Sequence, residues 1–130
     1  MNNWVRIILL VAVFAHGIGH ILFLIPMLGV ASWGQSAQSW LLTNLLGDKL
    51  TRGIGAVIWL AVILAYLAGL YGFFAQTPWW PQLLTGASGV SAIGLLLFWV
   101  STSPVISALI FDVVVIVVFQ IFKWPALSYS

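Results

Sequence analysis

GIGAVIWLAVILAYLAGLYGFF, residues 53–74, is the stretch that decides the fold class of this chain. It holds no charged residue, and about 20 apolar residues are enough for an α-helix to cross the hydrocarbon core of a bilayer. An α-helix satisfies its own backbone hydrogen bonds, which lipid cannot do for it. These residues therefore predict a membrane-spanning helix.

Three other stretches share this character, one before it in the chain and two after it. They cover about residues 4–26, 81–101 and 104–123. The composition agrees, because the chain is 63% hydrophobic and only 5% charged, whereas about 25% of residues are charged in an ordinary soluble domain. We therefore expect an all-α membrane protein, with a single transmembrane domain over residues 1–130 that forms an antiparallel bundle of four transmembrane helices.

Small residues predict how the second and third spans pack. In lipid, helices associate through close backbone approach and through hydrogen bonds between polar side chains. The small residues that share a face are Ala61, Ala65, Ala68 and Gly72 on the second span, and Thr85, Ser88 and Ala92 on the third. We expect both faces to contact neighbouring helices.

The segment between the first two spans is too polar to cross the membrane. Over about residues 35–47, Trp40 and several leucines fall on or near one stripe of a helix, with polar residues off it. This pattern predicts an amphipathic helix that lies in the membrane interface. An even number of spans places both termini on one side. Basic residues are balanced across the membrane, so only the terminal amine favours the cytoplasm for that side.

The two histidines of the chain, His16 and His20, lie in the first span, one helical turn apart and on one face. The only acid within any span is Asp112. An ionisable group at this depth costs about 2.5 to 3.5 kcal/mol, so it should face the bundle interior and find a partner. Counting about 1.5 Å per residue from each span's midpoint puts His16 and Asp112 at the same depth. We predict that they meet near the bilayer midplane.

Three further side chains at similar depths are candidates to complete a polar pocket. Ser91 lies at the middle of the third span. On the second span, Trp59 lies near the level of His20 and Tyr66 lies slightly across the midplane. The predicted ligand or proton site therefore consists of His16, His20, Asp112, Ser91, Tyr66 and Trp59.

Four interpretations of this cluster remain open. It can be a structural hydrogen bond that fixes helix register, or a relay for protons or ions. Two histidines one turn apart and a carboxylate from another helix can also bind a divalent metal such as zinc or ferrous iron, with His16, His20 and Asp112 as ligands. A haem or chlorin is the fourth candidate. Histidines on one face of one helix cannot ligate both sides of one haem, which excludes bis-histidine ligation within one chain.

The composition also excludes several classes of function. The chain has no cysteine, which excludes disulfides and thiolate metal sites. Its four basic residues form no cluster of the kind that binds nucleic acid. The sequence contains no recognisable nucleophile motif or phosphate-binding loop, and whether the chain is an enzyme stays open.

Three motifs resemble those of a group of small bacterial membrane proteins with four spans: AHGIGH at 15–20, TPWWPQLL at 77–84 and ALIFDVVV at 108–115. More distantly, the first span resembles DoxX-type membrane proteins, in which an arginine precedes a His-Gly-x-x-Lys pattern. Arg6 and His16-Gly17 match that pattern, and His20 stands where lysine is usual. The resemblance implies a four-helix bundle in the bacterial inner membrane, with His16, His20 and Asp112 as the positions of interest.

From these observations we expect a small integral membrane protein whose buried His/His/Asp site binds a metal ion, a proton or a small apolar ligand inside the bundle. The alternative is a non-catalytic accessory subunit of a larger respiratory, photosynthetic or transport complex. In that case other membrane subunits, or a second copy of the chain, are its partners in the lipid bilayer. An enzyme that acts on a lipid or a quinone is the third class of function.

Overall fold

A computed structural model describes residues 2–31 and 37–124 of the chain. Over those residues the fold is entirely helical. Its elements are α1 (Asn3–Gly19), α2 (Ile21–Leu28), α3 (Leu42–Leu46), α4 (Asp48–Phe74), α5 (Trp80–Leu97), α6 (Ser103–Ile116) and the π-helix η1 (Val117–Ile121).

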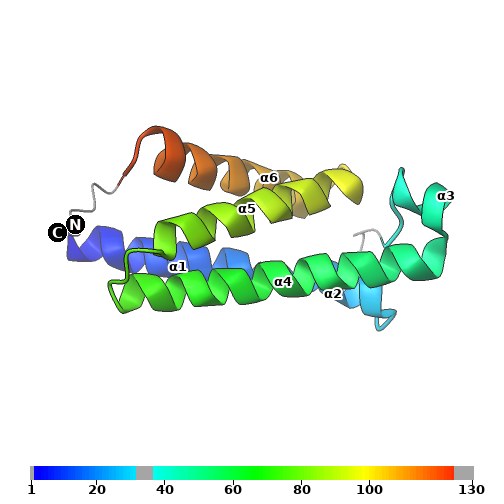
Figure 1. The fold of residues 1–130 in the computed structure, drawn as a ribbon, viewed down its shortest axis with the longest axis horizontal. Helices are drawn as coiled ribbons and strands as arrows, with labels where there is room; N and C mark the ends of the chain where they lie inside the picture. The colour runs from blue at the N-terminus through cyan, green and yellow to red at the C-terminus, as the bar shows by residue number, and fades with distance from the viewer. Residues whose placement is uncertain (1, 32–36, 125–130) are drawn as a thin grey trace.

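Within the described residues, four helical segments are long and apolar enough to cross a membrane: Asn3–Leu28, Asp48–Phe74, Trp80–Leu97 and Ser103–Ile121. They run alternately up and down in an antiparallel bundle, so that the start of α1 and the end of α6 lie at the same end (Figure 1). The predicted all-α bundle of four transmembrane helices is confirmed, and the protein is a multi-pass membrane protein. The second span begins at Asp48, earlier than residue 53, and the third ends at Leu97 rather than residue 101.

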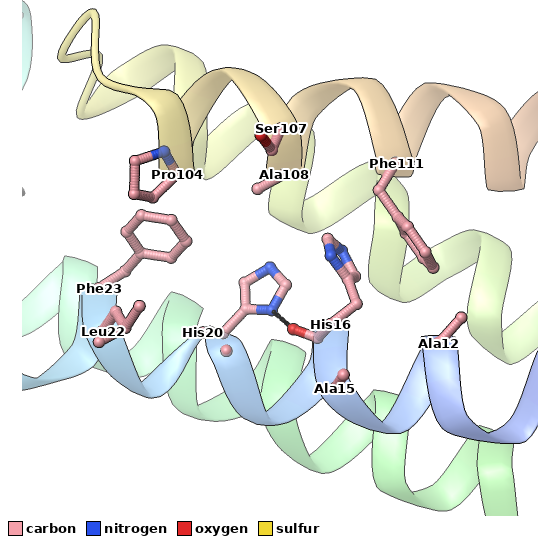
Figure 2. Close-up of a pocket in the computed structure, with 11 residues that line it drawn as sticks. Ala12, Ala15, His16, His20, Leu22, Phe23, Pro104, Ser107, Ala108 and Phe111 are labelled. Carbon is pink, nitrogen blue, oxygen red and sulfur yellow. Dashed lines mark hydrogen bonds between the residues drawn. The ribbon is translucent and has the colours of Figure 1, made fainter.

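The first span is broken at His20, between α1 and α2. In a regular α-helix the backbone N–H of residue 20 would bond to the carbonyl of residue 16. Here the His20 ring takes that carbonyl, with Nδ1 lying 2.8 Å from the oxygen of His16 (Figure 2). The backbone N–H of His20 bonds to Gly17 instead, at 3.3 Å. The interruption therefore has a local cause in the side chain of His20.

The inner face of α4 differs from the predicted one. Its buried residues follow helical spacing and combine glycines with large aromatic side chains: Thr51, Gly55, Trp59, Val62, Tyr66, Gly69 and Phe73. Of the predicted packing face, Gly72 is buried and Ala65 is half-buried against the core, whereas Ala61 and Ala68 are exposed. The side chain of Leu84 from α5 fills the space beside Gly69, where a Cβ would clash with it. Large side chains of neighbouring helices fill the space beside the buried glycines of α4, and Ala61 and Ala68 are left facing outward.

The connection between α2 and α4 contains a shorter helix than predicted. Of the predicted amphipathic helix over residues 35–47, positions 35 and 36 lie outside the described residues, and α3 covers Leu42–Leu46. Trp40 fixes this connection to the bundle, since its Nε1 donates to the carbonyl of Leu96 at the end of α5, at 2.7 Å. Its position at the membrane surface stays a prediction.

The order of helix contacts leaves α1 and α6 only loosely joined. α4 packs against α1, α2 and α5, and α5 packs against α6. α6 meets α1 through side chains, where His16 contacts Asp112 and Phe111. The bundle is therefore closed at mid-height by the residues predicted to form the site.

Candidate functional site

The centre of the cluster is a contact between the first and last spans. Nε2 of His16 lies 2.8 Å from Oδ1 of Asp112. Asp112 is fully buried, and the side chain of His16 is 9% exposed. Because a carboxylate can only accept hydrogen bonds, His16 donates from Nε2 to an ionised Asp112, which leaves Nδ1 of a neutral His16 as an acceptor. The predicted pairing of His16 with Asp112 is confirmed.

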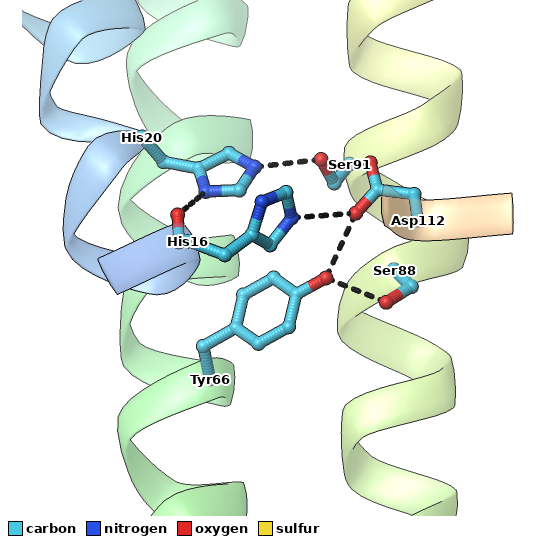
Figure 3. A network of polar contacts seen from close by, with 6 residues as sticks. All are labelled: His16, His20, Tyr66, Ser88, Ser91 and Asp112. Atoms are coloured by element: carbon cyan, nitrogen blue, oxygen red, sulfur yellow. Dashed lines mark hydrogen bonds and ion pairs between the residues drawn. The ribbon is translucent and has the colours of Figure 1, made fainter. Parts of the chain in front are cut away.

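Asp112 is bonded on one of its two oxygens. Oδ1 also accepts a hydrogen bond from the hydroxyl of Tyr66, at 2.8 Å. The oxygen of Tyr66 lies 2.5 Å from Oγ of Ser88, which donates to it (Figure 3). Oδ2 is buried and has no hydrogen-bond partner among the residues that the structure describes. A buried acceptor without a partner is unfavourable, and in native proteins it calls for a specific explanation such as a bound ion, water or ligand.

His20 is held in a single tautomer. Its Nδ1 must carry the proton, because the carbonyl of His16 can only accept. Nε2 of the neutral ring therefore accepts from the hydroxyl of Ser91, 2.7 Å away. Both nitrogens of this fully buried ring are thus engaged, one by its own helix and one by α5.

Aromatic rings enclose the two imidazoles. The ring of Phe111 stacks on His16 with centroids 4.0 Å apart and planes 20° apart, while Tyr66 stacks on His20 at 5.5 Å. Trp59 lies beside His20 at 5.7 Å. These rings fix the orientation of both imidazoles and shield most of the cluster from lipid.

The structure brings five of the six predicted residues into one polar network: His16, His20, Asp112, Ser91 and Tyr66. Trp59 contributes its ring only. Its Nε1 is buried without a hydrogen-bond partner among the described residues. Their role in binding a ligand or a proton stays a prediction.

Three residues outside the predicted site also shape the cluster. Ser88 was assigned to helix packing, although it lies three residues before Ser91 and so on the same face of α5. Phe111 carried no signal beyond its place next to Asp112. Gly17 lets α1 approach α4, since a Cβ at this position would lie 2.8 Å from Cβ of Tyr66.

The donor atoms are close enough to consider a shared ion. One ligand atom from each of His16, His20 and Asp112 lies within 4.8 Å of the others. Tetrahedral ligand bonds of about 2.0 to 2.2 Å place neighbouring donors on one zinc ion about 3.3 to 3.6 Å apart. Nε2 of His16 and Oδ1 of Asp112, now 2.8 Å apart, would have to separate slightly to share an ion. A bound ion would take the place of the proton now shared by this pair. Nε2 of His20 would have to leave Ser91 to complete the set.

Comparisons of the chain with protein-family models, with curated proteins and with solved structures give no match. The resemblance to DoxX-type proteins therefore stays a prediction, and the functional argument rests on the geometry of the cluster.

Proposed function

We propose that the protein binds a divalent transition metal ion, such as zinc or ferrous iron, inside the bundle through His16, His20 and Asp112. The observation that carries this proposal is the carboxylate of Asp112. Its Oδ2 is buried and has no hydrogen-bond partner among the described residues, and one nitrogen of each imidazole and one carboxylate oxygen lie within 4.8 Å of one another. Two histidines and one carboxylate form a donor set that suits such metals and leaves coordination positions open.

Charge supports a cation at this position. An ionised carboxylate near mid-bilayer needs a positive partner. The lysines and arginines lie near span ends: Arg6 near the start of α1, Lys49 and Arg52 in the first turns of α4, and Lys123 after η1. With both histidines neutral, a bound metal ion would supply the positive charge that Asp112 lacks among the described residues. Tyr66 and Ser88 would then act from outside the ligand set by orienting the carboxylate, as outer hydrogen bonds do at known metal sites.

We place the protein in the bacterial inner membrane, with both termini in the cytoplasm. The test is a metal measurement on protein extracted from that membrane and purified without a histidine tag. We expect one bound ion per chain by elemental analysis, and visible ligand-field bands when cobalt replaces it. Asp112→Asn should weaken binding by at least tenfold to a hundredfold, the loss typical of disturbed metal sites. The matched control is Asp48→Asn, because Asp48 is the other acid of the chain and lies exposed on the first turn of α4.

The rival interpretation is an accessory subunit in which the cluster only locks the helices together. It predicts metal-free protein with no cobalt bands, no effect of Asp112→Asn beyond a small change in thermal stability, and a large loss of stability in Asp112→Leu. That outcome would replace the metal proposal with the structural one. The absorption spectrum of the same sample also tests the haem or chlorin alternative, through the presence of a Soret or chlorin band.

A further inference from the structure

A groove runs between α1, α2 and α6 and opens to the side of the bundle. Its part around the imidazoles has a volume of about 370 Å³, within the range of about 300 to 1,000 Å³ typical of small-molecule sites. Figure 2 shows His16 on α1 and His20 at the break before α2 on one wall, with Pro104, Ser107 and Ala108 on the facing α6. Because these elements are membrane spans, a molecule that enters the groove from the side of the bundle comes from the lipid.

A second, apolar hollow adjoins this groove toward the other end of α1. This second part has a volume of about 250 Å³ and shares Ala12 and Phe111 with the first. It extends along α1 as far as Val5, whereas the first part reaches Phe23. At 1.5 Å per residue these two residues lie about 27 Å apart, close to the roughly 30 Å of the hydrocarbon core. A chain-shaped molecule can therefore lie along α1 with one point beside the imidazoles.

Gly19 keeps the groove open beside the histidines. A Cβ at this position would meet no atom within 4 Å, and the backbone does not need a positive φ there. Close helix packing therefore does not account for this glycine, in contrast to Gly17. The space that a larger side chain would occupy is part of the groove.

His16 presents an unused hydrogen-bonding atom to this space. Its side chain is nine-tenths buried and lines the groove. Its Nε2 is committed to Asp112, and Nδ1 has no partner among residues 2–31 and 37–124. Within a lipid environment no solvent satisfies such an acceptor. A ligand with a hydrogen-bond donor at that point would satisfy Nδ1.

The geometry points to a single-chain lipid with a neutral hydroxyl head as the occupant, its hydroxyl at His16 and its chain in the apolar part of the groove. In the metal-free pair the hydroxyl donates to Nδ1 of His16, and when a metal ion holds Nε2 the proton lies on Nδ1 and is donated to the hydroxyl oxygen instead. A hydroxyl head can serve both states, so this inference rests on the proposed function for part of its chemistry. A carboxylate or phosphate head is disfavoured, since it would add a second negative charge beside Asp112 far from the basic residues at the span ends.

The experiment uses a photoreactive analogue of hexadecanol with the full-length protein in lipid nanodiscs. After illumination, peptides that carry the label are identified by mass spectrometry. We expect labels on α1 and α6 along the groove, and unlabelled hexadecanol should compete roughly threefold to tenfold better than hexadecane, which has the same chain without the hydroxyl. Gly19→Leu should fill the groove and reduce labelling there at least tenfold.

The matched control is Gly86→Leu. Gly86 lies on α5, where a Cβ also meets nothing within 4 Å, and it lines a different groove between α4 and α5 without histidines. We expect it to label like the wild type. Equal competition by hexadecane, or labels spread evenly over all lipid-facing helices, would overturn the inference. So would a dimer of the wild type that Gly19→Leu converts to monomers, because the groove would then be an interface between copies.

Repeating the labelling after metal chelation separates this inference from the proposed function. Hydroxyl-dependent labelling that persists in a protein shown to bind no metal supports the lipid site and refutes the metal site. Metal binding without hydroxyl-dependent labelling supports the metal site and refutes the lipid site.

Discussion

His20 bonds through its ring to the carbonyl of His16 that its own backbone N–H would use in an unbroken helix. One side chain thus sets both the tautomer of the buried imidazole and the bend of the first span. With Nδ1 committed to the backbone, only Nε2 of His20 remains for Ser91 or for a metal ion. The break between α1 and α2 therefore belongs to the architecture of the cluster.

Removal of the His20 ring should repair this break. In His20→Leu, the carbonyl of His16 is free to accept the backbone N–H of residue 20, so α1 and α2 should join into one regular helix. Hydrogen exchange of the amides at residues 20 and 21 should then slow relative to the wild type. Ser91→Ala is the control, since it removes the partner of Nε2 while the bond from Nδ1 remains. Equal slowing in both variants would show that the ring bond is not the cause.

Two glycines two residues apart on α1 should respond differently to alanine. Gly17→Ala would place a Cβ 2.8 Å from Cβ of Tyr66, which is fixed to its backbone and cannot rotate away. We expect a loss of about 1 to 3 kcal/mol in the free energy of unfolding, as for overpacked cores. Gly19→Ala meets no atom and should be neutral or stabilise the helix by up to about 1 kcal/mol. Unfolding in a denaturing detergent measures both, and equal effects would contradict the close approach of α1 to α4.

The span composition and the helical rise were sufficient to predict the bundle and the meeting of His16 with Asp112. Depth in a membrane is nearly a one-dimensional coordinate, so counting residues from each span's ends identifies the level of a side chain. The helix faces were harder to predict. The inner face of α4 depends on partners such as Leu84, which fits against Gly69, and that complementarity is not visible in one helix alone.

The break at His20 and the role of Ser88 were missed for a different reason. Both depend on which of several possible hydrogen-bond partners a side chain takes, and the sequence does not distinguish these partners. A histidine in a span can bond to its own helix or to another, and a serine commonly bonds to its own backbone. Only the positions of His16 and Tyr66 in three dimensions decide between these alternatives.

Two substitutions of Asp112 separate structural from ligand-binding roles. Asp112→Asn retains an oxygen that can accept from His16 and Tyr66, so the loss in unfolding free energy should be small. Asp112→Leu leaves those two donors unsatisfied in the interior and should cost about 2 to 5 kcal/mol. Melting temperatures in one detergent rank the two variants. A loss in the Asn variant as large as in the Leu variant would show that the charge of Asp112, rather than its acceptor oxygen, holds the bundle together.

The hydroxyl of Tyr66 is the link through which α4 orients the carboxylate. In Tyr66→Phe, Oδ1 of Asp112 keeps His16 as a donor, and the hydroxyl of Ser88 can turn to a carbonyl of its own helix. We therefore expect a modest loss of about 0.5 to 1.5 kcal/mol in stability. Metal affinity should fall by roughly tenfold to a hundredfold, because the carboxylate loses the bond that fixes its orientation. Tyr71→Phe is the control, since Tyr71 lies exposed on the same helix. Unchanged cobalt affinity in Tyr66→Phe, with Tyr71→Phe as the reference, would show that the hydroxyl serves packing alone.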